Sequence, residues 1–401
     1  MNKRDNIIND MEAYFLAGCK KDQVCFGLEA EHFVVSESTG QEVGYEDVQG
    51  VESLLHTLLP QFTDAYYENG RLLGVSNGTA DISLEPGSQL EISVVQSNDI
   101  SEIEKNYTKY YAMIEAALKN RGQALLAQGY LPKASAAGQP LLPKARYYFM
   151  DEHFKNAGTM GVNMMRGTAS CQVSFDYTSQ EDFIDKYRCA CLVSPVLALM
   201  TSNAPVFEQK KNTNPLIRTH IWQNVDSQRT GILPATFDED FSFKKYAEFV
   251  LSQKAIFELI DGNPVKSDRT VLEVLTEVQG TQYHEAMLLY MSLVFPDVRL
   301  RQYIELRIAD SLPPADTIAY AAFLKGLFED AAGLKTWLAQ FPQSCEAIRQ
   351  AQEALMANGF EALVYGMPAK DFIRELLRLA VSQLKDSEKT YVRKGFAQYE
   401  L

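Results

Sequence analysis

The sequence predicts an α+β protein in which one mainly antiparallel β-sheet carries helices packed on one side. Two observations support this class. Four short segments alternate between apolar and polar residues, and amphipathic helical patterns fill much of the remaining chain. No repeat, low-complexity block or Gly/Ser-rich linker divides the 401 residues, so we expect one domain spanning 1–401. The expected strands are 25–35, 82–95 with a break at Pro86 and Gly87, 170–177 and 303–309.

The helical signal is clearest over residues 99–118, where apolar residues repeat on a single stripe. Residues 311–401 are predicted to be almost entirely helical. The stripe consists of Ile100, Ile103, Tyr107, Ile114 and Leu118. The other expected helices are 2–18, 181–201, 243–260, 268–294, 316–340, 344–358 and 369–386.

The composition limits the class of partner. The chain is 46% hydrophobic, enough for a packed core, and its formal charge of −14 repels phosphate backbones and anionic lipids. We therefore expect no nucleic-acid partner and no membrane-surface binding. The N-terminal residues lack the apolar run of a secretory signal, and the apolar stretch 189–200 is too short to span a membrane. These features predict a cytoplasmic location.

Cysteine and histidine spacing gives no metal or redox motif. The six cysteines form no CxxC pair, so we expect no zinc site, and Cys189 and Cys191 are interpreted as core residues. The five histidines include no HExxH motif. GxxxxGK[ST], GxGxxG and GxSxG motifs are also missing from the sequence, which excludes the common nucleotide-binding and hydrolase signatures.

Each expected strand has one apolar face and one face of oxygen-bearing side chains. Residues i and i+2 of a strand point the same way, so Glu29 and Glu31 share the face opposite Leu28 and Ala30. Taken singly, each strand also fits a sheet with one solvated side. The corresponding residues of the other segments are Glu85 with Glu91, Gln172, and Glu305 with Arg307.

Several acidic residues on one face favour a cation site. Glu29 and Glu31 lie about 7 Å apart at the rise of a strand, and such pairs raise each other's pKa unless a cation neutralises them. Mg²⁺ binds through a few carboxylates together with substrate phosphates. The acidic face therefore suggests a metal-bridged nucleotide, which would let an acidic protein bind a polyphosphate.

Several motifs stand in a fixed order between residues 25 and 310. The run 26–33 reads FGLEAEHF and the run 84–91 reads LEPGSQLE. In order and spacing the set resembles glutamate–cysteine ligases of the plant and proteobacterial branch, which have a GxExE strand and an LEPGGQxE signature. The later motifs are PKARY (143–147), GTMG (158–161), RTHIW (218–222), RTG (229–231), FPDVRL (295–300) and YIELR (303–307).

The resemblance implies a funnel-like antiparallel sheet of the glutamine synthetase and guanidino kinase type, with helices on its outer side. In this single catalytic domain, the sheet and the active site would lie mostly within 22–310, and 311–401 would form a helical C-terminal part. The implied reaction joins the γ-carboxylate of L-glutamate to the amine of L-cysteine through a γ-glutamyl phosphate. This ATP-dependent step begins glutathione biosynthesis.

The resemblance also implies residue roles by motif position. Arg307 and Glu305 would be catalytic, and Arg307 and Gln172 would contact ATP. The implied ligands of two or three Mg²⁺ ions are Glu29, Glu31, Glu85, Glu91, Glu305 and Gln172. The implied substrate-binding residues are Arg146, Arg218, Trp222, Thr168, Ser170 and Arg229.

One position departs from the family's MMxRT pattern. The sequence reads Met164-Met165-Arg166-Gly167-Thr168, so the arginine stands one place early. On a strand this shift turns the side chain to the other face, which leaves a related ligase with another amine or acid as an alternative. A small-molecule kinase and a non-catalytic nucleotide-binding module are further alternatives. We expect a monomer or homodimer.

Overall fold

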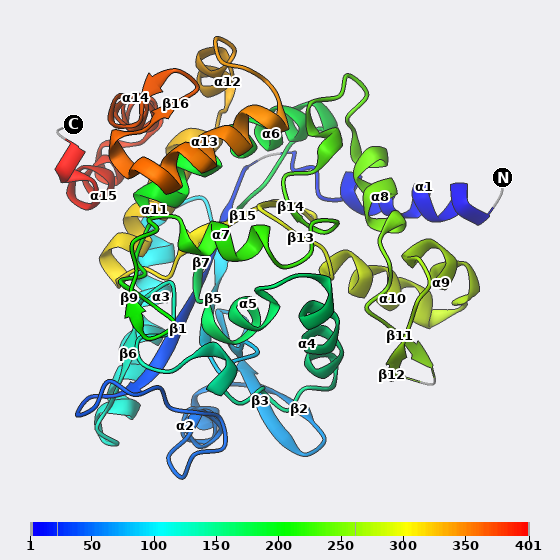
Figure 1. Cartoon of the computed structure of the whole chain (residues 1–401), viewed down its shortest axis with the longest axis vertical. Coiled ribbons are helices and arrows are strands. Elements are labelled where there is room, and N and C mark those ends of the chain that lie inside the picture. Colours follow the sequence, from blue (N-terminus) through cyan, green and yellow to red (C-terminus); the bar gives the residue numbers. More distant parts are fainter. Residues whose placement is uncertain (1–2, 22, 261, 400–401) are drawn as a thin grey trace.

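The computed structural model describes residues 3–21, 23–260 and 262–399, and one large antiparallel sheet organises them (Figure 1). Its strand order is β14-β15-β7-β1-β5-β4-β3-β2, and β6 pairs with the end of β1. The α+β class and the antiparallel sheet are thereby confirmed. The strands are β1 (Phe26–Ser36), β2 (Asp64–Glu68), β3 (Arg71–Ser76), β4 (Ala80–Leu84), β5 (Leu90–Ser97), β6 (Gln123–Leu126), β7 (Ser170–Phe175), β14 (Val298–Leu300) and β15 (Ile304–Asp310).

Helices form most of the remaining structure. They are α1 (Lys3–Leu16), α2 (Val51–Leu58), α3 (Ile100–Lys119), α4 (Ala145–Ala157), α5 (Gly161–Gly167), α6 (Gln180–Met200), α7 (Ile217–Gln223), α8 (Phe243–Ser252), α9 (Val271–Glu277), α10 (Thr281–Ser292), α11 (Pro314–Phe328), α12 (Ala332–Leu338), α13 (Cys345–Asn358), α14 (Ala369–Gln383) and α15 (Asp386–Gly395). No helix in the described part of the chain has the length and apolarity needed to cross a membrane.

Four short strand pairs lie outside the large sheet. β10 (Thr230–Gly231) pairs in parallel with β13 (Phe295–Pro296). The other three are antiparallel hairpins: β8 (Val206–Phe207) with β9 (Lys210–Lys211), β11 (Phe257–Ile260) with β12 (Asn263–Lys266), and β16 (Leu363–Val364) with β17 (Met367–Pro368).

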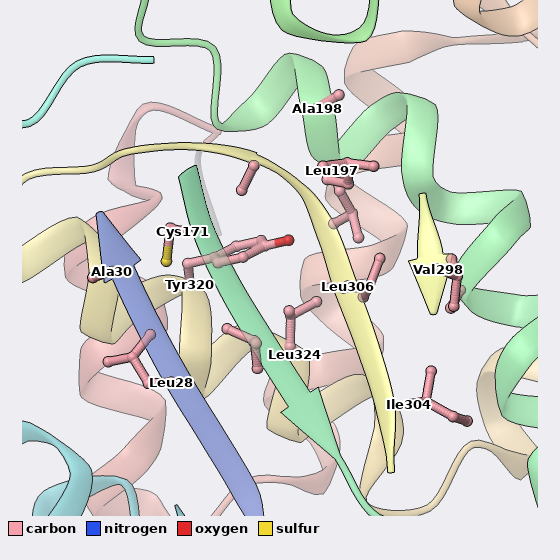
Figure 2. Packing of buried hydrophobic residues seen from close by; sticks show 14 of the residues in the cluster. Leu28, Ala30, Cys171, Leu197, Ala198, Val298, Ile304, Leu306, Tyr320 and Leu324 are labelled. Atoms are coloured by element: carbon pink, nitrogen blue, oxygen red, sulfur yellow. The ribbon is translucent and has the colours of Figure 1, made fainter. Parts of the chain in front are cut away.

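The apolar face of the sheet carries the core. Figure 2 shows Leu28 of β1 and Leu306 of β15 beside Tyr320 and Leu324 of α11. Helix α11 packs on β1 and β7, and α6 packs on β15. Because strand side chains alternate, burying this face turns the acidic residues of the same strands to the opposite side, where α4, α5 and α7 lie.

Several predicted boundaries are wrong. The helix expected over 243–260 ends at Ser252, and residues 257–260 form β11 instead, in a hairpin with β12. The helix expected over 268–294 is divided into α9 and α10 at Gly280, whose φ of 66° is left-handed. The β2–β3 hairpin was missed although Asn69-Gly70, both at positive φ, is a strong hairpin signal. Residues 311–399 are helical apart from β16–β17 and short connections.

Candidate active site

A cavity of about 270 Å³ opens on the polar side of the sheet. It is lined by residues from β1, β5, β7 and β15, from the turn between β4 and β5, and from α4, α5, α7 and α10. Most of the residues predicted from the sequence meet here. They are Glu29, Glu31, Glu85, Glu91, Arg146, Thr168, Gln172, Arg218, Trp222 and Arg307.

The acidic part of the cavity is built by strand register. Glu31 of β1 lies directly opposite Glu91 of β5, and Glu29 lies opposite Gln172 of β7. Glu85 stands where β4 ends, before a turn in which Ser88 N donates to Glu85 O. The four glutamates thus come from three neighbouring segments onto one surface.

The turn after β4 is fixed against α5. A Cβ on Gly87 would lie 2.5 Å from the carbonyl oxygen of Arg166, so only glycine allows this approach. Gln89 locks the turn, because its Oε1 accepts from Gly87 N and its Nε2 donates to Thr168 O at 2.6 Å. These contacts explain why the 84–91 motif has its residue types and how it places Glu85.

Burial and mutual repulsion raise the pKa values of the acidic group. Desolvation and then Glu305 raise the pKa of Glu29 to about 7, and desolvation and then Glu85 raise that of Glu31 to about 7. Desolvation, followed by Glu29, raises the pKa of Glu91. Glu31 accepts from the Ser170 amide and hydroxyl, both at 2.7 Å, yet its pKa stays high. The cavity therefore has more buried negative charge than its own donors neutralise.

Glu305 differs from the other glutamates because two arginines pair with it. Arg299 donates from Nε and Nη2 to the two carboxylate oxygens at 2.6 and 3.1 Å, and Arg307 Nη1 lies 3.2 Å away. Burial would raise the pKa of Glu305, but the arginines outweigh it and lower that pKa to about 2. Arg307 also donates to Gln172 at 2.6 Å. Glu305 is thus the counter-ion of two arginines beside the cavity.

Three buried donors mark the walls formed by α4 and α7. Among the described residues, Nε of Arg146, Nε of Arg218 and Nε1 of Trp222 are buried without a hydrogen-bond partner. Arg218 and Trp222 are four residues apart, so they lie on the same face of α7. A buried N–H without an acceptor is costly, and all three groups border the cavity. A ligand with carboxylate oxygens would satisfy them.

Two predicted substrate-binding residues do not reach the cavity. Arg229 is buried and donates to Asp226 at 2.7 Å and to the carbonyls of Leu293 and Lys254. Ser170 uses both its donors on Glu31. Arg229 therefore has a structural role, and Ser170 orients the Glu31 carboxylate. Neither residue is placed to contact a substrate in the cavity.

The strand interpretation of Arg166 and Gly167 is wrong, because both lie on helix α5. Arg166 points to Asp151, with Nη2 2.7 Å from Oδ1, and does not line the cavity. A Cβ on Gly167 would lie 2.7 Å from the ring of Tyr130, a fully buried side chain. Tyr130 therefore fills the space beside residue 167, and no side chain at that position is available to the cavity.

Sequence reasoning missed several lining residues. Arg299 and Arg301 precede the recognised YIELR run, and their own RLR alternation was the available signal. The apolar wall could not be inferred from one sequence, since it joins α4, α5, the residue that follows α10, and β13. It consists of Met150, Met164, Met165, Leu293 and Phe295.

The carboxylates and the Gln172 amide of the cavity are oxygen donors of the kind that Mg²⁺ accepts. In the described part of the chain no three His, Cys, Asp or Glu side chains form a preassembled metal cluster. Mg²⁺ commonly uses one or two carboxylates, with water and substrate phosphates completing its shell. The raised pKa values of Glu29 and Glu31 show that their ionised forms lack positive charge nearby. A bound Mg²⁺ ion would supply that charge.

Known proteins resemble the chain over most of its length. The family model described as glutamate-cysteine ligase family 2 matches residues 25–393. Chloroplastic glutamate–cysteine ligase B of Oryza sativa subsp. japonica is 30% identical over 339 residues, covering 82% of this chain and 67% of that protein. The Arabidopsis thaliana chloroplastic enzyme is also 30% identical, covering 82% and 64%. The chain thus spans about two thirds of the length of these relatives.

A solved structure supports the fold. The glutamate–cysteine ligase of Francisella tularensis in complex with AMP superposes with a TM-score of 0.57, covering 95% of this chain and 82% of that chain. At 13% sequence identity this likeness concerns the fold alone.

Proposed function

Because this chain belongs to glutamate-cysteine ligase family 2, we propose that it joins the γ-carboxylate of L-glutamate to the amine of L-cysteine at the expense of ATP. The observation that carries the proposal is the cavity itself, in which four glutamates, Glu31 of them buried, and five arginines line one space. This arrangement suits a polyphosphate and a second anion held close together.

Glu29, Glu31, Glu85 and Glu91 are the proposed ligands of two or three Mg²⁺ ions, with Gln172 beside them. Bound Mg²⁺ would neutralise the phosphate oxygens and stabilise the charge of the transferring phosphoryl group. Glu31 is the best oriented of the four, since the Ser170 amide and hydroxyl and Gln172 Nε2 fix its carboxylate. Glu305 is proposed to act mainly by aligning arginines.

Arg299, Arg301 and Arg307 are proposed to contact the phosphates of ATP. Arg307 Nη1 donates to both Gln172 and Glu305, so its guanidinium is oriented before ATP binds. Preorganised charge of this kind stabilises the transition state of phosphoryl transfer. Transfer of the γ-phosphoryl group to the glutamate γ-carboxylate gives γ-glutamyl phosphate, and attack by the amine then releases phosphate.

Arg146, Arg218 and Trp222 are proposed to bind the carboxylates of glutamate, with Thr168 at the edge of this wall. Their unpaired N–H groups give the reason. The neighbouring apolar wall, which includes Met150 and Phe295, would receive the uncharged side chain of the second amino acid.

The test is an ADP-release assay with glutamate, with and without cysteine, together with mass spectrometry of the product. γ-Glutamylcysteine formed only in the complete mixture would support the proposal. Full ADP release with glutamate alone would indicate a kinase, and no nucleotide turnover would refute every ATP-based function. Controls without Mg²⁺ should be silent.

A related ligase for a different amine is the second candidate, and Gly167 favours it. Because Tyr130 occupies the space beside Gly167, the arginine of the family's MMxRT pattern has no equivalent in the cavity. A panel of amines in the same assay separates the two functions. The cytoplasmic location and the monomer or homodimer stay predictions, testable by fractionation and light scattering.

A further inference from the structure

One glutamine of the C-terminal helical part reaches the back of the proposed substrate wall. Gln352 of α13 is buried, and its Nε2 donates to Oδ2 of Asp297 at 3.3 Å. Its Oε1 accepts from Nε2 of Gln223 at 2.9 Å. Gln223 ends α7, the helix that carries Arg218, and Asp297 lies between β13 and β14. A single side chain thus joins two segments that form the wall.

Asp297 is placed to act on the arginines of this wall. Its carbonyl accepts from Arg307 N at 3.1 Å, and its amide donates to Gly231 O at 2.9 Å, so its main chain is fixed. The side chain borders a small space of about 10 Å³ together with Arg218 and Arg307. No direct ion pair joins Asp297 to either arginine within the described ranges, and the carboxylate interacts with both arginines at longer range.

The orientation of the Gln352 side-chain amide is set by its two partners. A carboxylate accepts hydrogen bonds, so Nε2 of Gln352 must face Asp297 and Oε1 must face Gln223. Burial raises the pKa of Asp297 to about 6, and the Gln352 hydrogen bond opposes that rise, as do Arg218 and Arg307. Leucine at position 352 would remove the donor, and glutamate would set a second carboxylate against the first.

We propose that Gln352 is a positioning residue of the active site. By tying Asp297 to the end of α7, it fixes the guanidinium of Arg218 in the orientation that binds the carboxylate substrate. The C-terminal helical part thereby contributes to substrate affinity. This inference rests on the proposed function, because glutamate binding is its readout.

The test compares the wild type with Gln352→Leu, Gln352→Glu and Asp297→Asn. The matched control is Gln350→Leu, since Gln350 is an exposed glutamine of the same helix whose amide donates to Glu346, a residue of that helix. Thermal unfolding establishes that each variant is folded. Steady-state assays then give KM for glutamate, KM for ATP and kcat separately. Quenching of Trp222 fluorescence, measured in a Trp337→Phe background, reports glutamate binding without turnover.

We expect Gln352→Leu to raise KM for glutamate about ten-fold while KM for ATP changes less than two-fold, because Arg307 keeps its own contacts with Gln172 and Glu305. Gln352→Glu should be worse than Gln352→Leu, Asp297→Asn should resemble Gln352→Leu, and Gln350→Leu should match the wild type. If the wild type is active and folded Gln352→Leu has an unchanged KM for glutamate, the role of Gln352 is refuted while the proposed function stands. An equal rise in KM for glutamate and KM for ATP has the same consequence. A wild type without glutamate-dependent turnover refutes the proposed function and the inference with it.

Discussion

Glu31 of β1 and Glu91 of β5 lie directly opposite each other in the antiparallel register, and both line one cavity. Like charges in directly opposed positions destabilise a sheet. The pair is therefore poor for stability, and a cation that binds both carboxylates would remove the repulsion. The predictions about metal and pH follow from this relationship.

The first prediction concerns the metal-free protein. The pKa values of Glu29 and Glu31 are about 7 in the folded state and near 4.5 when unfolded. Between these values the folded state binds more protons, so the free energy of unfolding falls as pH rises from about 4.5 to 7. Mg²⁺ binds the ionised groups, and saturation at 100 times Kd adds about 2.7 kcal/mol. Mg²⁺ should therefore raise Tm more at pH 8 than at pH 5.5.

Differential scanning fluorimetry with and without Mg²⁺ at constant ionic strength measures this effect. The triple variant Glu29→Gln/Glu31→Gln/Glu91→Gln is the control and should lose most of the pH dependence and most of the Mg²⁺ shift. An equal Mg²⁺ shift at both pH values would show that these carboxylates are not the binding groups.

The second prediction concerns Arg307. Arg307→Lys keeps a positive charge but loses the planar guanidinium, of which one nitrogen, Nη1, contacts both Gln172 and Glu305. We expect kcat to fall about 10²–10³-fold, the usual loss for one preorganised charge, with Tm almost unchanged. Arg349→Lys, at an exposed ion pair of α13, is the matched control. Turnover within a factor of three of the wild type would remove Arg307 from the mechanism.

The third prediction concerns Ser88, which adopts a φ of 70° although it is not glycine. The related family has glycine at this place in its LEPGGQxE signature. A left-handed conformation costs a residue with a Cβ about 1–2 kcal/mol. Ser88→Gly should therefore raise the free energy of unfolding, measured by urea denaturation, by up to about 1 kcal/mol after the entropic cost of glycine. A destabilised Ser88→Gly variant would mean that the serine makes a compensating contact.

The fourth prediction concerns Gly167. A Cβ here would meet the Tyr130 ring at 2.7 Å, so Gly167→Ala should destabilise the fold by about 1–3 kcal/mol. Gly333→Ala is the control, because its Cβ would meet nothing within 4 Å and α12 gains a better helix former. Equal unfolding free energies for wild type and Gly167→Ala would show that Tyr130 moves aside freely.

The sequence predicted the acidic face because strand alternation is local. Glu29, Glu31 and Glu91 could be assigned to one face from period-2 patterning alone, and the β4–β5 turn from Pro86-Gly87. The pairing of Glu305 with arginines, which distinguishes it from the other glutamates of the site, could not be predicted. It depends on Arg299, which lies opposite Glu305 only in the β14–β15 register.

The error at Gly167 had a tertiary cause. The short run 161–167 is helical because it packs on α4, where Gly161 approaches the Phe154 carbonyl too closely for any Cβ. Local propensity does not encode such a contact. The role of Gln352 likewise comes from partners 55 and 129 residues away in sequence, and Arg229 adds to its local partner Asp226 two carbonyls that are 25 and 64 residues away.

The most direct test of the ligase account follows oxygen atoms from glutamate. The protein is incubated with Mg²⁺–ATP, cysteine and glutamate labelled with ¹⁸O in its γ-carboxylate, and the phosphate released is analysed by mass spectrometry. Attack of the carboxylate on the γ-phosphorus followed by amide formation must leave one labelled oxygen in each phosphate. We predict that the released phosphate carries this labelled oxygen and that γ-glutamylcysteine is formed. Unlabelled phosphate would contradict the proposed acyl-phosphate ligation.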